Sequence, residues 1–348
     1  MHRFYRSWKL FVVCLLMAAE PLLAKETDLN KPVYATFETS LTKCNNQEYE
    51  AALQLAKRIR QQYPDSPAGV FAQVIAYQTL METFRISTYQ SRLDSLLGFA
   101  VKISKKSLKR DKRNGLNYFY LAIAYGARSA TYARRGKWLE ALRDGSRIKA
   151  NLERAIKYNP DFYDSYYGIG TYNYWVSAKA KILRVFGDHR QQGIEQVKMA
   201  TEKARFLKTN ALYGLSSIYF NEERYEEAVQ LCEQIDELYP HNPTGFYRAG
   251  RTYQRLGKWQ EAKNEFTEVW KILQETPYQS ISYQVDCLYQ LARCEQALGN
   301  IPKSKTTCEE ALALAKKCDF SKELNGPFEK YEDILEELND FYAELQPK

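Results

Sequence analysis

The stretches YEEAVQLCEQIDELYP at residues 225–240 and WQEAKNEFTEVW at residues 259–270 decide the fold of this chain. Their alanines, Ala228 and Ala262, occupy equivalent positions in a repeated pattern. Each alanine has a tyrosine nine positions before it, an aromatic residue three positions before it and a small residue twelve positions before it. A fixed period of about 34 residues predicts stacked helical hairpins, in which each unit covers the apolar face of its neighbour.

This pattern of small and aromatic positions resembles the tetratricopeptide repeat family, whose units are helix–turn–helix hairpins. Residues 209–242 and 243–276 form the clear units, and residues 285–318 form a weaker one, with Ser304 where alanine is expected. The resemblance implies an all-α fold, a right-handed solenoid of about six or seven hairpins.

More divergent units are expected over residues 25–208, where alanine, glycine and tryptophan recur in repeat register. A C-terminal cap is expected over residues 319–348, with an amphipathic helix at residues 327–345. The apolar stripe of this helix consists of Phe328, Tyr331, Ile334, Leu335, Leu338 and Phe341. The middle segment GIG (168–170), YWVS (174–177) and FGDHR (186–190) also resembles the inclusion-body clearance family, also called tetratricopeptide repeat protein 39. No function is carried over from that resemblance.

Residues 1–24 have the pattern of a secretory signal peptide. Arg3, Arg6 and Lys9 precede an apolar run at residues 10–19, and Ala24 offers a small residue for cleavage. A membrane-spanning helix needs about 20 apolar residues, so this run is too short for an anchor. We therefore expect export, to the periplasm or the cell envelope, and no nucleic-acid ligand.

Charge is unevenly distributed along the chain. Residues 101–208 contain 24 basic and 9 acidic residues, whereas residues 209–348 contain 15 basic and 24 acidic ones. The densest basic stretch, residues 102–113, suits anionic headgroups at a membrane surface or an acidic partner, although a solvated helix face is the simpler interpretation.

Six cysteines follow the signal-like segment, and export permits disulfides between them. Cys287 and Cys294 are seven residues apart on an expected helix, about 10 Å along its axis, which is too far for a bridge. Most of these cysteines are expected to act as small core residues.

In tetratricopeptide arrays the first helix of each unit lines the concave groove. The resemblance therefore implies that Tyr213, Tyr247 and Tyr289, which recur at one repeat position, form an aromatic ladder in this groove. Arg251 and Arg255 share a helix face and offer guanidinium forks for carboxylates, unless they pair with acids of neighbouring helices. The candidate partner-binding residues are Tyr213, Phe220, Asn221, Tyr247, Arg251, Gln254, Arg255, Tyr289 and Arg293.

These features favour a non-enzymatic scaffold that holds a partner peptide with an acidic side chain or a free C-terminus. No cofactor or metal is expected, since the sequence has no Cys-x-x-Cys, His-Glu-x-x-His or phosphate-binding glycine motif. Two other classes stay open. The crowded aromatics of residues 162–175 suit a glycan or another non-protein ligand, and Asp188, His189 and Arg190 could form an uncharacterised catalytic site.

Overall fold

The protein folds as a curved stack of helical hairpins. A computed structural model describes residue 29, residues 31–180 and residues 188–346. These residues contain fifteen α-helices and a single isolated β-bridge. The hairpins are α2 (Pro32–Asn45) with α3 (Tyr49–Gln62), α4 (Ala68–Phe84) with α5 (Gln90–Arg110), α6 (Gly115–Arg134) with α7 (Trp138–Tyr158), α8 (Asp164–Ala180) with α9 (Arg190–Lys203), α10 (Lys208–Asn221) with α11 (Tyr225–Leu238), α12 (Pro243–Arg255) with α13 (Trp259–Glu275), and α14 (Ile281–Ala297) with α15 (Ile301–Ala315). A short 3₁₀ helix η1 (Phe320–Lys322) and the capping helix α16 (Tyr331–Glu344) follow.

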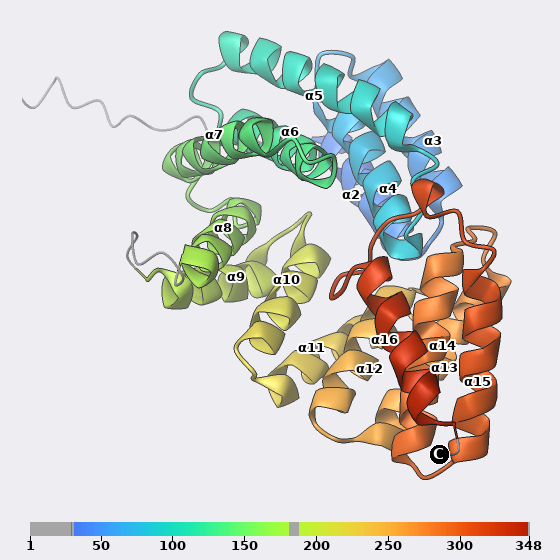
Figure 1. Ribbon diagram of the computed structural model, residues 1–348. Coiled ribbons are helices and arrows are strands. Elements are labelled where there is room, and N and C mark those ends of the chain that lie inside the picture. The colour runs from blue at the N-terminus through green and yellow to red at the C-terminus, as the bar shows by residue number, and fades with distance from the viewer. Residues whose placement is uncertain (1–28, 30, 181–187, 347–348) are drawn as a thin grey trace, which may run out of the picture.

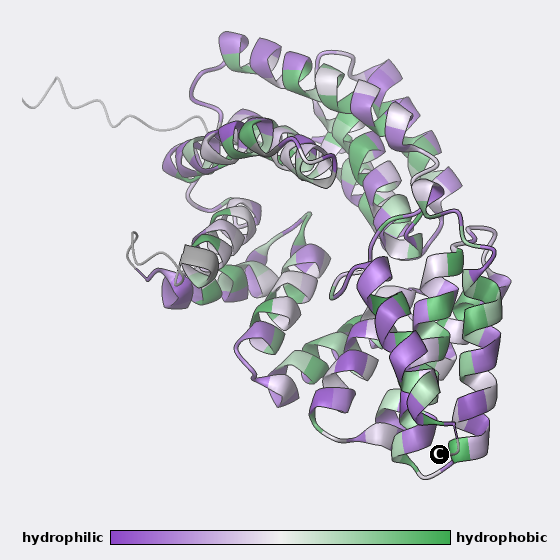
Figure 2. Ribbon diagram, viewed as in Figure 1, coloured by the Kyte–Doolittle hydropathy of each residue, from purple (hydrophilic) through white to green (hydrophobic). Residues whose placement is uncertain are grey.

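This arrangement confirms the expected all-α solenoid. The clear repeat units coincide with α10/α11 and α12/α13, and their crossing residues Ala228 and Ala262 are buried. The weaker unit coincides with α14/α15, although α14 begins at Ile281. Apolar residues face inward between the helices, and polar residues cover outward surfaces such as that of α5 (Figure 2).

Serine replaces alanine at some helix crossings without leaving its hydroxyl unsatisfied. Ser304 is fully buried, and its hydroxyl donates to the carbonyl oxygen of Ala292 at 2.8 Å. Ser40 donates in the same way to Ala52 at 3.0 Å, across the α2/α3 hairpin. A buried hydroxyl is tolerated when it finds an acceptor, so the serine in the weak repeat is compatible with the hairpin.

The cysteines of the described chain behave as core residues. Cys44, Cys232, Cys287, Cys294 and Cys308 are buried, Cys318 is partly exposed, and all six are unbridged. This confirms the expectation that Cys287 and Cys294 do not bond to each other. Burial raises the pKa of the Cys232 thiol to about 12, so this side chain stays a neutral thiol at ordinary pH.

The capping helix is shorter than predicted. It begins at Tyr331 rather than at residue 327, because the Asn325 side chain accepts the Tyr331 N–H at 2.8 Å and so satisfies a free donor of the first turn there. Phe328 therefore lies outside the apolar stripe to which it was assigned. Ile334 and Leu338 of that stripe are buried as expected.

The stack curves until its two ends meet. The last hairpins come back beside the first ones (Figure 1), and the segment before α16 contacts the residues that directly follow α4. One buried apolar cluster accordingly extends from Val33 in α2 to Cys294 in α14. Across the seam the Tyr49 and Tyr278 rings meet edge to face at 5.8 Å, although they lie far apart in the sequence.

A buried ion pair joins the two ends. Arg85 Nη1 donates to Asp286 Oδ2 at 2.6 Å, and both side chains are almost fully buried. The Arg85 guanidinium lies over the Tyr283 and Tyr247 rings, at 3.8 and 4.6 Å from their centroids. Burial opposes ionisation of Asp286, but the charges of Arg85 and Arg251, with hydrogen bonds from Tyr247 and Gln290, outweigh it and lower the pKa of Asp286.

Removal of Asp286 is expected to open this closure. Asp286→Ala leaves the buried Arg85 charge without its partner, which costs about 3–5 kcal/mol of unfolding free energy. Chemical denaturation measures this loss. Asp65→Ala is the control, because Asp65 pairs with Lys106 and Arg110 on the exposed surface and contributes little. Equal midpoints for the two variants would contradict a structural role for the closing pair.

Glycines bring α8 and α9 into backbone contact. A Cβ atom on Gly193 would lie 2.6 Å from the carbonyl oxygen of Gly170, and one on Gly170 would lie 2.8 Å from that of Gly193. Neither carbonyl can move without displacing a helix. A Cβ atom on Gly168 would lie 2.9 Å from the side chain of Leu152 in α7. The glycines of the middle segment thus set the close approach of its helices.

Gly193→Ala is expected to lower the unfolding free energy by about 1–3 kcal/mol through overpacking. Gly145→Ala is the matched control, because a Cβ atom on Gly145 of α7 meets no atom of the described residues within 4 Å. Alanine is the better helix former there, so that variant should gain up to about 1 kcal/mol. Thermal or chemical denaturation of both gives the comparison, and a neutral Gly193→Ala would refute the close crossing.

Candidate functional site

A hollow of about 900 Å³ lies on the inner side of the curve. The C-terminal part of α4, the middle of α8, α10 and the first turns of α12 form its walls, and residues 320–328 close one side. It exists because the seam brings α4 opposite α10 and α12. No single repeat unit could enclose it.

Four of the nine predicted residues line this hollow: Tyr213, Phe220, Asn221 and Tyr247. Asn221 is already engaged, since its side-chain N–H donates to the Tyr174 hydroxyl at 2.6 Å. The Tyr247 hydroxyl donates to Asp286 Oδ2 at 2.6 Å, and its ring is only 2% exposed. Tyr213 and Phe220 therefore offer more accessible surface to a ligand than Tyr247 does.

The two arginines of the predicted pair lie in different environments: Arg251 is buried and Arg255 is exposed. The Arg251 side chain is 6% exposed and forms an ion pair with Glu329 from the segment before α16. Arg255 is exposed, with its guanidinium 5.9 Å from the Phe220 ring centroid. Gln254 is buried and donates to Cys294 Sγ at 3.7 Å. Arg251 thus takes the alternative role noted above, pairing with an acid of this chain.

The capping helix covers the far end of the predicted surface. Tyr289 is 4% exposed, donates to Glu337 of α16 at 3.2 Å and packs edge to face on Phe341. Arg293 donates to Gln290 at 3.2 Å on the same helix. The expected open aromatic ladder is therefore wrong at Tyr289, which α16 covers, whereas Tyr247 lines the hollow but is almost fully buried. The repeat register could not show that residues 323–344 fold back over these positions.

Four buried polar atoms in the wall of the hollow find no hydrogen-bond partner in the described part of the chain. Arg85 Nη2, Thr171 Oγ1, Tyr213 Oη and Arg248 Nε are buried, and none has a hydrogen-bond partner among the described residues. All four side chains line the hollow. Sequence reasoning missed Arg85, Thr171 and Arg248: the first two lie in divergent repeats, and Arg248 lies beside a groove position rather than on one.

An unusual carboxyl group lies behind this wall. Asp236 of α11 is 8% exposed and packs on the first turn of α12, where a Cβ atom on Gly245 would collide with its Oδ1. Burial, with the nearby carboxylates of Glu265 and Glu233, raises the pKa of Asp236 to about 8. Burial also raises the pKa of Glu265 to about 7. This part of the α11–α13 interface is thus sensitive to pH.

We expect Asp236 to make stability fall as the pH rises. Its folded pKa lies above the ordinary 3.8, so the folded chain holds a proton that the unfolded chain releases between pH 3.8 and about 8. Asp236→Asn should flatten the dependence of unfolding free energy on pH over this window. Urea denaturation at several pH values tests it, with Glu237→Gln, an exposed acid on the same helix, as control. Parallel profiles for wild type and Asp236→Asn would show that Asp236 ionises normally.

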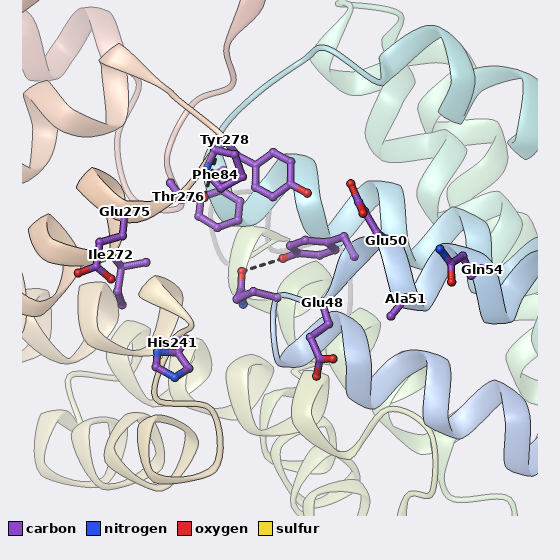
Figure 3. Close-up of a pocket in the computed structure, with 13 residues that line it drawn as sticks. Glu48, Glu50, Ala51, Gln54, Phe84, His241, Ile272, Glu275, Thr276 and Tyr278 are labelled. Atoms are coloured by element: carbon purple, nitrogen blue, oxygen red, sulfur yellow. Dashed lines mark hydrogen bonds between the residues drawn. The ribbon is translucent and has the colours of Figure 1, made fainter.

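A second hollow, of about 640 Å³, lies outside the seam between α3 and the end of α13 (Figure 3). Glu48, Glu50, Glu275 and His241 lie around it. The Tyr49, Phe84 and Tyr278 rings pack against one another in its lining. Tyr49 and Phe84 are buried core residues, and the charged side chains in the lining of this hollow are those of Glu48, Glu50 and Glu275.

Asp188, His189 and Arg190, the residues considered for catalysis, lie together before and at the start of α9. His189 is exposed and its backbone N–H donates to the Ser177 hydroxyl, while Arg190 pairs with Asp188 and Glu222. His241 is exposed in the turn before α12. Within the described part of the chain, no three His, Cys, Asp or Glu side chains are grouped as metal ligands would be.

Two further expectations concern surfaces. The basic stretch 102–113 covers the end of α5, where Lys106 and Arg110 pair with Asp65. Of the aromatics in residues 162–175, Phe162 and Tyr174 are core residues, while Tyr167 and Trp175 line the main hollow. None of the helices described is both long and apolar enough to cross a bilayer.

Two family models match the chain. A tetratricopeptide repeat model matches residues 219–284. The model described as Regulator of microtubule dynamics protein 1-3 matches residues 36–244, which is more than half of the chain. The chain belongs to this family. The match includes the middle segment with the glycine crossings, and the tetratricopeptide resemblance is confirmed.

Similar proteins support the same fold. The TPR repeat-containing protein MJ1428 of Methanocaldococcus jannaschii is 22% identical over 250 residues, which cover 66% of this chain and 42% of that protein. The chain thus spans less than half the length of this curated relative. The Cut9–Hcn1 hetero-tetramer of the APC/C matches with a TM-score of 0.52 and 14% identity, over 86% of this chain and 50% of that one.

Two further repeat structures match less closely. PilW, a type IV pilus biogenesis factor, has a TM-score of 0.48 and 15% identity, over 74% of this chain and 95% of its own. YrrB, a TPR protein with an unusual peptide-binding site, has a TM-score of 0.44 and 16% identity, over 62% of this chain and 93% of its own. The tetratricopeptide fold of this chain is in general that of a protein–protein interaction scaffold.

Proposed function

We propose that this chain is a non-enzymatic scaffold that binds an extended segment of a partner protein in the main hollow. The observation that carries the proposal is the set of four buried polar atoms, on Arg85, Thr171, Tyr213 and Arg248, without a partner among the described residues. A buried polar group left unsatisfied costs about 1–3 kcal/mol. A ligand that satisfies several of them gains that free energy on binding.

The chemistry of these atoms indicates an acceptor-rich ligand. Arg85 Nη2 and Arg248 Nε can only donate, whereas the hydroxyls of Thr171 and Tyr213 can donate or accept. An extended peptide presents a carbonyl oxygen at every residue, and an acidic side chain or a free C-terminus adds a carboxylate for the arginines. The volume of about 900 Å³ falls within the range of roughly 300–1,000 Å³ found for ligand pockets.

The location of this scaffold in the cell envelope is part of the proposal. It is supported by the signal-like pattern of residues 1–24, which lie outside the described residues. The exposed basic end of α5 offers a second contact for an acidic partner or an anionic surface.

Removal of one unpartnered hydroxyl tests the site. Peptides selected from a random display library on the intact protein should bind Tyr213→Phe about threefold to tenfold more weakly, because a hydrogen bond to the ligand is worth about 0.5–1.5 kcal/mol. Stability should be unchanged or higher, since the hydroxyl has no partner in the described chain. Titration calorimetry and thermal denaturation measure the two effects.

Tyr120→Phe provides a matched control. The Tyr120 hydroxyl is also buried without a partner among the described residues, but it lies in the core away from the hollow. Affinity should not change in this variant. If the selected peptides bound Tyr213→Phe as tightly as wild type, or if the library yielded no binder, the proposal would be contradicted. Solvent alone would then satisfy the four buried polar atoms.

A further inference from the structure

The segment before α16 lies inside the curve and not on the outer surface. Residues 323–330 run as a loop along the concave side (Figure 1). The Leu324 N–H donates to the Arg85 carbonyl oxygen at 2.8 Å, and Glu323 forms an antiparallel bridge with Ile86. The chain thus reaches its own groove in an extended conformation, which is how a peptide strand would enter it.

Phe328 fills an aromatic slot in that groove. Its ring centroid lies 4.9 Å from that of Phe220 and 6.0 Å from that of Tyr247. The guanidinium carbons of Arg251 and Arg248 lie 5.0 and 5.9 Å from the same centroid. Paired rings prefer such separations, and a cation over a ring face is attracted to it. The slot therefore favours an aromatic side chain over an aliphatic one.

The next residue, Glu329, binds an arginine fork. Its two carboxylate oxygens accept from Nη1 and Nη2 of Arg251, the first at 2.5 Å. Arg251 Nη1 also donates to the Tyr247 hydroxyl at 3.3 Å, which holds the fork in place. A two-pronged pair of this kind selects a planar carboxylate. An aromatic residue followed by an acidic one is therefore the sequence that the slot fits.

Helix α16 does not depend on this contact. It packs on α14 and α15 through Tyr331, Ile334 and Leu338, all buried. Asn325, Pro327 and Lys330 of the intervening loop are not buried. Residues 325–330 can therefore leave the groove while α16 stays packed, because their two anchoring side chains make contacts separate from those of the helix.

We propose that the slot formed by Phe220, Tyr247, Arg248 and Arg251 recognises partner peptides in which an aromatic residue is followed by an acidic one. Phe328 and Glu329 occupy it in cis until such a peptide replaces them. This inference rests on the proposed function, because Phe220, Tyr247 and Arg248 also line the main hollow. It adds the chemistry of the partner peptide. It also explains how Phe328 and Glu329 exclude peptides that bind the slot too weakly to replace them.

A peptide copied from the segment tests the inference. A fluorescent ELNGPFEKY, the sequence of residues 323–331, is titrated into the intact wild-type protein and into Phe328→Ala/Glu329→Ala. In the variant, Phe328 and Glu329 no longer occupy the slot and so do not compete with the peptide. The variant should therefore bind the peptide at least about tenfold more tightly than wild type does. The peptide with alanine at both positions should bind neither protein. Glu336→Ala, which removes an exposed acid of α16, should behave as wild type.

A second measurement uses the unaltered protein, because loss of Glu329 leaves Arg251 buried without its acid and destabilises the variant. Excess ELNGPFEKY should displace the segment and speed trypsin cleavage after the exposed Lys330. The doubly alanine-substituted peptide should not, although its own lysine competes equally for the protease. Equal affinity for variant and wild type, together with unchanged cleavage, would overturn the inference and leave the segment as a fixed structural clamp.

The outcomes separate this inference from the proposed function. Library peptides that respond to Tyr213→Phe but lack an aromatic–acidic pair would leave the scaffold standing and refute the slot. Binding of ELNGPFEKY that responds to Phe328→Ala/Glu329→Ala but not to Tyr213→Phe would support the slot and refute the proposal that the unpartnered polar atoms of the hollow hold the peptide.

Discussion

The buried ion pair between Arg85 and Asp286 is the constraint on which the rest of the structure depends. It connects the end of α4 with α14 across 201 residues of sequence. Arg85 itself has a left-handed backbone, with φ of 53°, a conformation that costs a residue with a Cβ atom roughly 1–2 kcal/mol. Such strain persists where surrounding contacts determine the geometry. Here two tyrosine rings, the Asp286 carboxylate and the Leu324 N–H hold Arg85 in place.

Closure turns a concave surface into a partly enclosed hollow. An open solenoid would leave α10 and α12 facing solvent, but here α4 and residues 320–328 stand opposite them. Polar groups in the wall are thereby removed from bulk water without gaining partners in the described chain. Burial also raises the pKa of Tyr213 well above its usual value, so its hydroxyl stays neutral and able to donate. The same closure that stabilises the ends of the chain therefore creates the groups that favour a ligand.

Part of the candidate site could be predicted from repeat register. Tyr213, Phe220 and Asn221 lie in the hollow because the first helix of a regular hairpin presents fixed positions to the inner side. Arg251 and Tyr289 occupy the same register, yet they are covered by Glu329 and by α16. Arg85 and Thr171 belong to divergent units and carried no periodic signal. Register places a side chain on a helix face, but it does not show which distant segment covers that face.

The sequence by itself determined the hairpins, their order and their buried small residues, because each depends on contacts between helices adjacent in the chain. The repeat period, the alanines at the crossings and the glycine and proline turns are sufficient for that. Only the tertiary structure decided that the ends meet, that Phe328 and Glu329 leave the predicted capping helix and that a hollow forms. These features arise from pairings such as Arg85 with Asp286 and Arg251 with Glu329, which join residues 201 and 78 positions apart. Their partners are set by the accumulated curvature of the whole stack, and no local pattern encodes that curvature.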